Sequence, residues 1–129
     1  SVGMYSEYGN VGILIANGTF SGFRPMSRSY GNGTYTLKGN EKETVFFVNT
    51  SKGSTTFYLP SNPQPDQRYE IRKLHSGNSI IINAQNNGDI YVTGSNNPSS
   101  QISWTGRRCV TIQYSKNLDA WVMWFSYEA

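Results

Sequence analysis

The sequence is poor in the residues on which most catalytic and metal sites depend. Its 129 residues contain one cysteine, Cys109, and one histidine, His75. A single cysteine excludes an intrachain disulfide. His75 lies in a predicted turn that is far from Cys109 in the sequence, so a cysteine–histidine nucleophile is not indicated. One cysteine and one histidine are also too few for an ordinary zinc site. We therefore expect Cys109 to be a small buried or half-buried side chain.

Charged residues make up only 15% of the chain, and the formal net charge is +3. Acids are interleaved with the bases, so there is no basic run of the kind that binds nucleic acid. The basic residues are densest in two pairs, Arg72-Lys73 and Arg107-Arg108. We favour a solvated strand face for both pairs; the alternative is a surface that contacts acidic polysaccharide or membrane phosphates. The apolar runs fall far short of the roughly 20 residues that span a membrane. We expect neither a nucleic-acid partner nor membrane insertion.

The eight acidic residues stand in no catalytic motif. A glycosidase needs two carboxylates about 5–10 Å apart, and Glu70 with Asp89 is the pair that the sequence leaves open. Solvated or turn-forming roles are the preferred interpretation for both. Calcium is an open alternative at Asn86, Asn87 and Asp89, which are read more simply as a turn. We expect no enzyme, no metal and no cofactor.

Aromatic residues, at 14% of the chain, and turns of the Asn-Gly kind are abundant. Segments with the alternation or the short apolar runs of strands cover residues 11–16, 34–38, 44–49, 54–59, 68–74, 79–85, 89–93, 101–104, 107–114 and 120–127. No helical period competes with them, so the sequence predicts one all-β domain over residues 1–129, a sandwich or barrel. Residues 18–33 show weak periodicity and are predicted to form a long loop.

The last predicted strand is apolar on both faces. Alternation places Trp121, Met123, Phe125 and Tyr127 on one face, opposite Val122 and Trp124. An antiparallel strand usually exposes one face to water. The pattern therefore predicts either a strand covered on both sides or burial in an oligomer. The predicted interface comprises Trp121, Met123, Trp124, Phe125 and Tyr127.

Aromatic rings that stack on sugars and guanidinium groups that hold carboxylates are the candidate ligand-binding residues. Trp104 is prominent, because small and polar residues flank it and Arg107 and Arg108 follow. A buried or interface tryptophan is the alternative interpretation. The predicted ligand-binding residues are Trp104, Arg107, Arg108, Tyr58 and Tyr30.

Two regions of the chain carry a family resemblance. Residues 59–73, LPSNPQPDQRYEIRK, are followed by the IIIN strand at 80–83, and residues 106–123 form a closing hairpin with Gly106, Val110, Thr111, Tyr114 and Trp121 at its motif positions. These regions resemble the "LPSNPQDGQxYxIRK" and "GxxxVTLxYxxxxxxWxV" patterns of head or knob domains at the tips of bacteriophage tail fibres and needles. Pro65-Asp66 departs from the Asp-Gly of the first pattern, and no stalk is present.

The resemblance covers about the C-terminal 75 residues and implies an antiparallel β-sandwich, jelly-roll or tumour-necrosis-factor-like, assembled as a homotrimer on the virion. It implies non-catalytic attachment to a host-surface glycan or protein receptor, with residues 1–10 as the junction to a missing shaft. A monomeric carbohydrate-binding module or lectin and a trimeric capsid-decorating protein are the alternatives. A small hydrolase ranks last.

Overall fold

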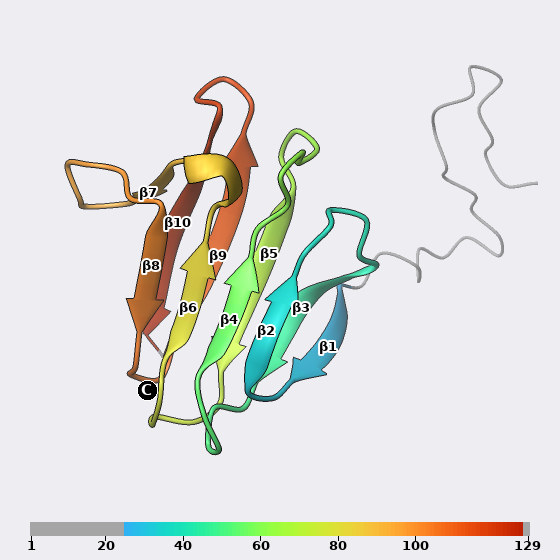
Figure 1. Ribbon diagram of the computed structural model, residues 1–129, viewed down its shortest axis with the longest axis vertical. Coiled ribbons are helices and arrows are strands. Elements are labelled where there is room, and N and C mark those ends of the chain that lie inside the picture. Colours follow the sequence, from blue (N-terminus) through green and yellow to red (C-terminus); the bar gives the residue numbers. More distant parts are fainter. Residues whose placement is uncertain (1–24, 128–129) are drawn as a thin grey trace, which may run out of the picture.

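The computed structural model describes residues 25–127, which form two β-sheets that face one another (Figure 1). In spatial order, the six-stranded sheet comprises β1 (Met26–Tyr30), β3 (Glu43–Val48), β5 (Arg68–Lys73), β9 (Arg108–Ser115), β10 (Ala120–Tyr127) and β7 (Ile90–Val92). The four-stranded sheet comprises β2 (Gly33–Thr36), β4 (Thr55–Tyr58), β6 (Ile80–Asn83) and β8 (Gln101–Trp104). A single 3-10 turn, η1 (Gln85–Asn87), follows β6. In the described range no helix is long and apolar enough to cross a membrane.

The chain passes back and forth between the two sheets from β1 to β6. As a result β1, β3 and β5 run parallel in one sheet, and β2, β4 and β6 run parallel in the other. The later strands β8, β9 and β10 then pair antiparallel with β6, β5 and β9. Of the eight pairings between described strands, five are parallel.

The all-β prediction is therefore confirmed, whereas the antiparallel prediction is corrected to two mixed sheets. Jelly rolls belong to the antiparallel architectures, so the parallel pairs depart from the jelly-roll or tumour-necrosis-factor-like connectivity that we expected. Parallel neighbours cannot be joined by a tight hairpin and need a crossover connection. Here each crossover contains a strand of the opposite sheet.

Strand alternation explains which side chains fill the space between the sheets. In β3, Phe46 is fully buried while its neighbour Phe47 is half-buried on the outer face. The Phe46 ring stacks on Phe57 of β4 with 5.6 Å between centroids, which connects one sheet to the other. The cluster continues with Tyr69 of β5, whose ring centroid is 5.3 Å from that of Phe46. Trp121 of β10 follows, with its ring centroid 6.2 Å from that of Tyr69. Buried aromatic surface is the largest apolar contribution that a core of this size can make.

Glu41, in the connection between β2 and β3, is fixed by several hydrogen bonds. The Tyr69 hydroxyl donates to Glu41 Oε1 at 2.6 Å, the Lys38 N–H donates to Oε2 at 2.6 Å, and the Gly39 N–H donates to Oε1 at 3.1 Å. Burial raises the pKa of the Glu41 carboxyl, but the hydrogen bonds from Tyr69 and the backbone outweigh it and hold the pKa below its ordinary value. Burial and the adjacent carboxylate raise the pKa of Tyr69.

The observed strands match nine of the ten predicted segments to within a few residues. The segment predicted at 11–16 lies outside the described residues. The strand β1 falls within residues 18–33, which were predicted as a loop, so this prediction is corrected. Only Tyr30 of β1 is buried and the other four residues are exposed, so the sequence of this edge strand carries no alternating apolar signal.

Several turns place asparagine or aspartate in the left-handed region of the backbone. Asp66 has a φ of 63°, Asn86 of 58° and Asp119 of 50°. Asparagine and aspartate adopt this conformation more readily than other residues with a Cβ atom. Asp66 stands where the tail-fibre pattern has glycine, the residue with the least steric cost at positive φ.

Candidate functional site

A polar pocket of about 250 Å³ lies where three loops meet at one end of the two sheets. We call it the loop-end pocket. These loops are at the top of Figure 1. The three loops are the β4–β5 connection, η1 with its flanks, and the β9–β10 turn. Its lining residues are Pro60, Ser61, Asn62, Pro63, Ala84, Gln85, Asn86, Gly88, Asp89, Tyr114, Asp119, Ala120 and Trp121.

Hydrogen bonds tie the three loops to one another. Gln85 Nε2 donates to the Leu59 carbonyl at 2.7 Å, which joins η1 to the β4–β5 connection. The Trp121 N–H donates to the Asp89 carbonyl at 3.0 Å, which joins β10 to the segment after η1. The walls of the pocket are therefore fixed before a ligand arrives, which lowers the entropic cost of binding.

The rim of the pocket carries side chains that can hydrogen-bond to a ligand. Asn62, Asn86 and Asp89 are exposed, and their side chains make no hydrogen bond to another residue between 25 and 127. The Tyr114 hydroxyl donates to Asp119 Oδ1 at 2.7 Å, and this bond raises the pKa of Tyr114. Amides that donate and carboxylates that accept can together hold several hydroxyl groups of one ligand.

Trp121 forms part of the floor of the pocket and does not offer an exposed ring face for stacking. Its side chain is only 4% exposed, and its ring meets Tyr114 edge-on at 5.5 Å. Two carboxylates, Asp89 and Asp119, give the pocket a negative charge, with no basic residue in the lining. The pocket therefore suits a neutral or cationic hydroxyl-rich ligand better than an anion.

A second hollow, of about 220 Å³, lies beside the opposite end of β9. We call it the basic cleft. Its lining residues are Phe47, Arg72, Lys73, Leu74, Arg107 and Cys109. Since β9 is eight residues long, the basic cleft and the loop-end pocket are about 25 Å apart along this strand.

Lys73, at the end of β5, is buried, with 2% of its surface exposed. Its Nζ donates to the carbonyls of Thr105 at 2.7 Å and Gly77 at 3.1 Å, and to that of His75. Burial lowers the pKa of the Lys73 amine. The Arg72-Lys73 pair was predicted to lie on a solvated strand face, and this is corrected for Lys73: Arg72 is exposed, but Lys73 points inward and binds loop carbonyls.

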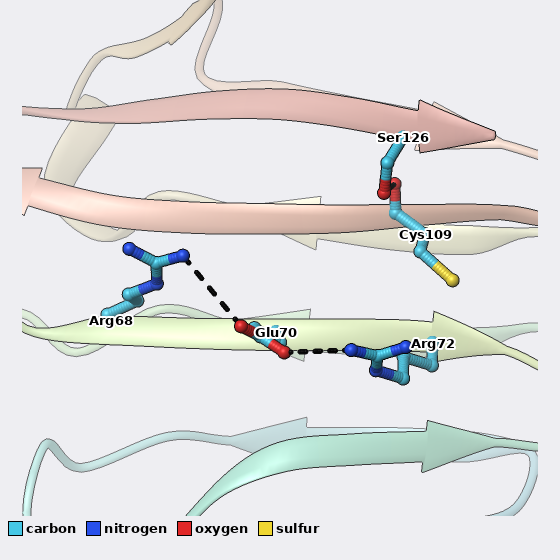
Figure 2. Close-up of polar contacts among 5 residues, drawn as sticks. All are labelled: Arg68, Glu70, Arg72, Cys109 and Ser126. Atoms are coloured by element: carbon cyan, nitrogen blue, oxygen red, sulfur yellow. Dashed lines mark hydrogen bonds and ion pairs between the residues drawn. The ribbon is translucent and has the colours of Figure 1, made fainter. Parts of the chain in front are cut away.

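Glu70 lies between two arginines on the outer face of β5, as Figure 2 shows. Glu70 Oε1 is 3.8 Å from Arg68 Nη2, and Glu70 Oε2 is 3.2 Å from Arg72 Nη2. Cys109 and Ser126 follow on β9 and β10, where the register pairs Arg72 with Cys109 and Cys109 with Ser126. Exposed ion pairs contribute little to stability, so we expect these two contacts to add little to the stability of the fold.

Among the predicted ligand-binding residues, Trp104, Arg107 and Arg108 lie near one another. Trp104 is only 7% exposed and its Nε1 donates to the Arg108 carbonyl at 3.1 Å. Arg108 is half-buried, with its guanidinium carbon 3.9 Å from the ring centroid of Phe125, a predicted interface residue. Phe125 in turn meets Trp104 edge-on at 5.3 Å. Only Arg107 of these residues is exposed, and it lines the basic cleft.

The other two predicted ligand-binding residues are on different strands. Tyr30 is 6% exposed and packs edge-on against Phe46 at 4.9 Å and Phe57 at 5.0 Å, so it belongs to the core. Tyr58 is 39% exposed on β4, in the other sheet from Arg107. The structure thus does not gather the five predicted residues into one site.

The predicted interface residues of β10 divide between the two faces of the sheet. Trp121 and Met123 point into the core, at 4% and 0% exposure, and leave little surface for another copy of the chain. Trp124 is half-buried on the outer face, with the guanidinium carbon of Arg68 5.5 Å from its ring centroid. Tyr127 is the last residue of β10.

The structure separates the two carboxylates that the sequence left open as a catalytic pair. Glu70 lies on the outer face of β5, while Asp89 lines the loop-end pocket, where its acidic neighbour is Asp119. Across residues 25–127 no three His, Cys, Asp or Glu side chains are grouped to hold a metal ion. Cys109 is 7% exposed, which confirms the prediction of a small buried side chain.

No protein-family model matches the chain, and no curated protein matches it either. The comparisons therefore leave the family unassigned, and the site geometry carries the functional argument.

Proposed function

We propose that the chain is an attachment domain at the tip of a phage tail fibre or needle, which binds a host-surface glycan without chemistry. The loop-end pocket is the proposed glycan site. The observation that carries the proposal is the set of three cross-bonded loops around a pocket lined by amides, carboxylates and a tyrosine hydroxyl. Binding sites commonly lie on such loops at the end of a rigid scaffold.

The polarity of the pocket favours a neutral or amino sugar. Sugar hydroxyls both donate and accept hydrogen bonds, and Asn62, Asn86 and Asp89 offer both functions from two different loops. The pocket is open and contains no exposed aromatic platform, so we expect weak single-site affinity. Three copies on one fibre tip would gain about 10²–10⁴ in avidity, which turns weak contacts into stable attachment.

The family resemblance supports the same site. The LPSNP segment, the most distinctive part of the resemblance, supplies residues 60–63 of the pocket wall. Further along that segment, Asp66 adopts positive φ where the tail-fibre pattern has glycine.

The homotrimer and the virion location are parts of this proposal. Trp124 is the member of the predicted interface with surface on the outer face of the six-stranded sheet. Solution mass from light scattering distinguishes the alternatives. A monomer that binds glycans is a carbohydrate-binding module or lectin, and a trimer that binds capsids instead of cells is a capsid-decorating protein.

A bacterial glycan array tests the proposed function. Wild-type chain should bind a defined set of neutral or amino-sugar glycans. N62A and D89A should each weaken binding about tenfold, because each removes a group able to hydrogen-bond a sugar hydroxyl. Both side chains are exposed and make no hydrogen bond to another described residue, so the fold should be preserved.

The matched control is N40A, an exposed asparagine between β2 and β3 that is not in the pocket lining. It should bind as wild type does. Wild-type chain that binds no glycan, or N62A and D89A that bind as tightly as N40A, would overturn the proposal.

A further inference from the structure

The basic cleft brings together Arg72 and Arg107, which are far apart in the sequence. Arg72 is paired with Cys109 in the register of β5 and β9. Arg107 directly precedes β9 and lines the same cleft as Arg72 and Cys109. Two guanidinium groups that line one cleft can hold a single oxyanion between them.

The charge in the cleft is not neutralised within its lining. No acid is among the residues that line it. Arg107 is exposed and forms no ion pair with any other residue of the described range. Arg72 is held from the side by Glu70, with 3.2 Å between Arg72 Nη2 and Glu70 Oε2.

The base of the cleft is rigid. Lys73 binds the Gly77 carbonyl from the β5–β6 connection and the Thr105 carbonyl from the β8–β9 connection, which draws the two loops together. Thr50 Oγ1 also donates to the Gly77 carbonyl, at 2.5 Å. The backbone of the β8–β9 connection is therefore held at Thr105, two residues before Arg107, and such preorganisation favours affinity.

We propose that the basic cleft binds an oxyanion, the carboxylate or phosphate group of an acidic polysaccharide, between the guanidinium groups of Arg72 and Arg107. Arginine is suited to this role because its planar donors match the geometry of carboxylate and phosphate. Phe47 and the exposed Leu74 add apolar surface beside the charges, against which a sugar ring can lie.

This inference goes beyond the proposed glycan site at the other end of β9. That pocket is acidic and disfavours anions, whereas the cleft is basic and favours them. The two sites share no lining residue, so variants of one leave the other intact. Failure of anion binding and failure of neutral-glycan binding are therefore separate results.

The experiment is an NMR titration of the full chain with sodium glucuronate and, separately, with sodium phosphate, each at constant ionic strength balanced with sodium chloride. We expect saturable shifts at the backbone amides of the cleft and at the side-chain Nε–H of Arg107. R107Q should weaken binding about tenfold, as expected for the loss of a charged hydrogen-bonding partner. R72Q should have a similar effect.

R68Q is the matched control, because Arg68 lies on the same face of β5 and contacts the same Glu70 but does not line the cleft. It should bind as wild type does. Tighter binding of glucuronate would assign a uronic-acid polysaccharide, and tighter binding of phosphate a phosphate-bearing one. Shifts that rise linearly with either anion, or equal weakening by R107Q and R68Q, would overturn the proposal. The exposed position of Arg107 ahead of β9 keeps this test independent of folding.

Discussion

Replacing Lys73 by methionine should destabilise the protein strongly, although methionine is similar in size and apolar. The Lys73 ammonium group donates to three loop carbonyls, those of His75, Gly77 and Thr105. A hydrogen bond to a charged group contributes about 1.5–3 kcal/mol. Desolvation of a buried ammonium opposes these bonds by several kcal/mol. K73M relieves the desolvation but removes the charged donor from all three carbonyls, and Thr50 Oγ1 remains as a donor to the Gly77 carbonyl at 2.5 Å and to the His75 carbonyl at 3.5 Å. We therefore expect a net loss of about 2–4 kcal/mol.

Urea unfolding followed by tryptophan fluorescence measures this loss as a lower midpoint with an unchanged slope. The matched control is K52M, because Lys52 is exposed in the β3–β4 connection. It should change the free energy of unfolding by less than about 0.5 kcal/mol. If K73M were as stable as K52M, the three carbonyls would not depend on Lys73, and the argument for a rigid base of the basic cleft would fail.

Three further predictions concern the core, a half-buried carboxylate and a turn. F46A should cost about 3–5 kcal/mol in urea unfolding, whereas F47A, on the outer face, should cost clearly less; equal losses would contradict the assigned faces. E41Q should lower stability by about 1–2 kcal/mol at pH 7. Because the folded-state pKa of Glu41 is lowered, its stabilisation is fully present above the ordinary value of 4.5 and is lost as the pH falls through the lowered value. Thermal melts from pH 7 to 3 should therefore show wild type and E41Q converging in acid, while E70Q stays close to wild type at every pH; a constant gap for E41Q would refute this. D66G should keep the free energy of unfolding to within about 0.5 kcal/mol of wild type, while D66V should lose about 1–2 kcal/mol at the positive φ; equal effects would argue against that turn conformation.

The positions of the strands could be predicted from the sequence, but their partners could not. Alternation of apolar residues identifies a strand and its buried face, as at Phe46 and Phe57, because burial acts on each strand separately. It does not encode the direction of the neighbouring strand. That direction depends on the course of the long connections, which is why an antiparallel arrangement was expected and mixed sheets were found. The edge strand β1 was missed because only Tyr30 of its residues is buried.

The candidate sites were less predictable because each is assembled from distant segments. The turn at Asn86 and Asp89 is visible in the sequence, but nothing near it indicates Asn62 or Asp119, which reach the loop-end pocket from other loops. The burial of Lys73 has the same cause, since the Thr105 carbonyl that it binds is 32 residues away. Residue type did not separate core rings such as Tyr30 from surface rings.

The most direct test of the central claim is an NMR titration of isotopically labelled wild-type chain with the neutral or amino-sugar glycan that the array selects. The account predicts saturable shifts confined to residues 60–63, 84–89 and 119–121, which are the three walls of the loop-end pocket. Shifts that map to another surface, or a glycan that leaves these resonances unmoved, would contradict it.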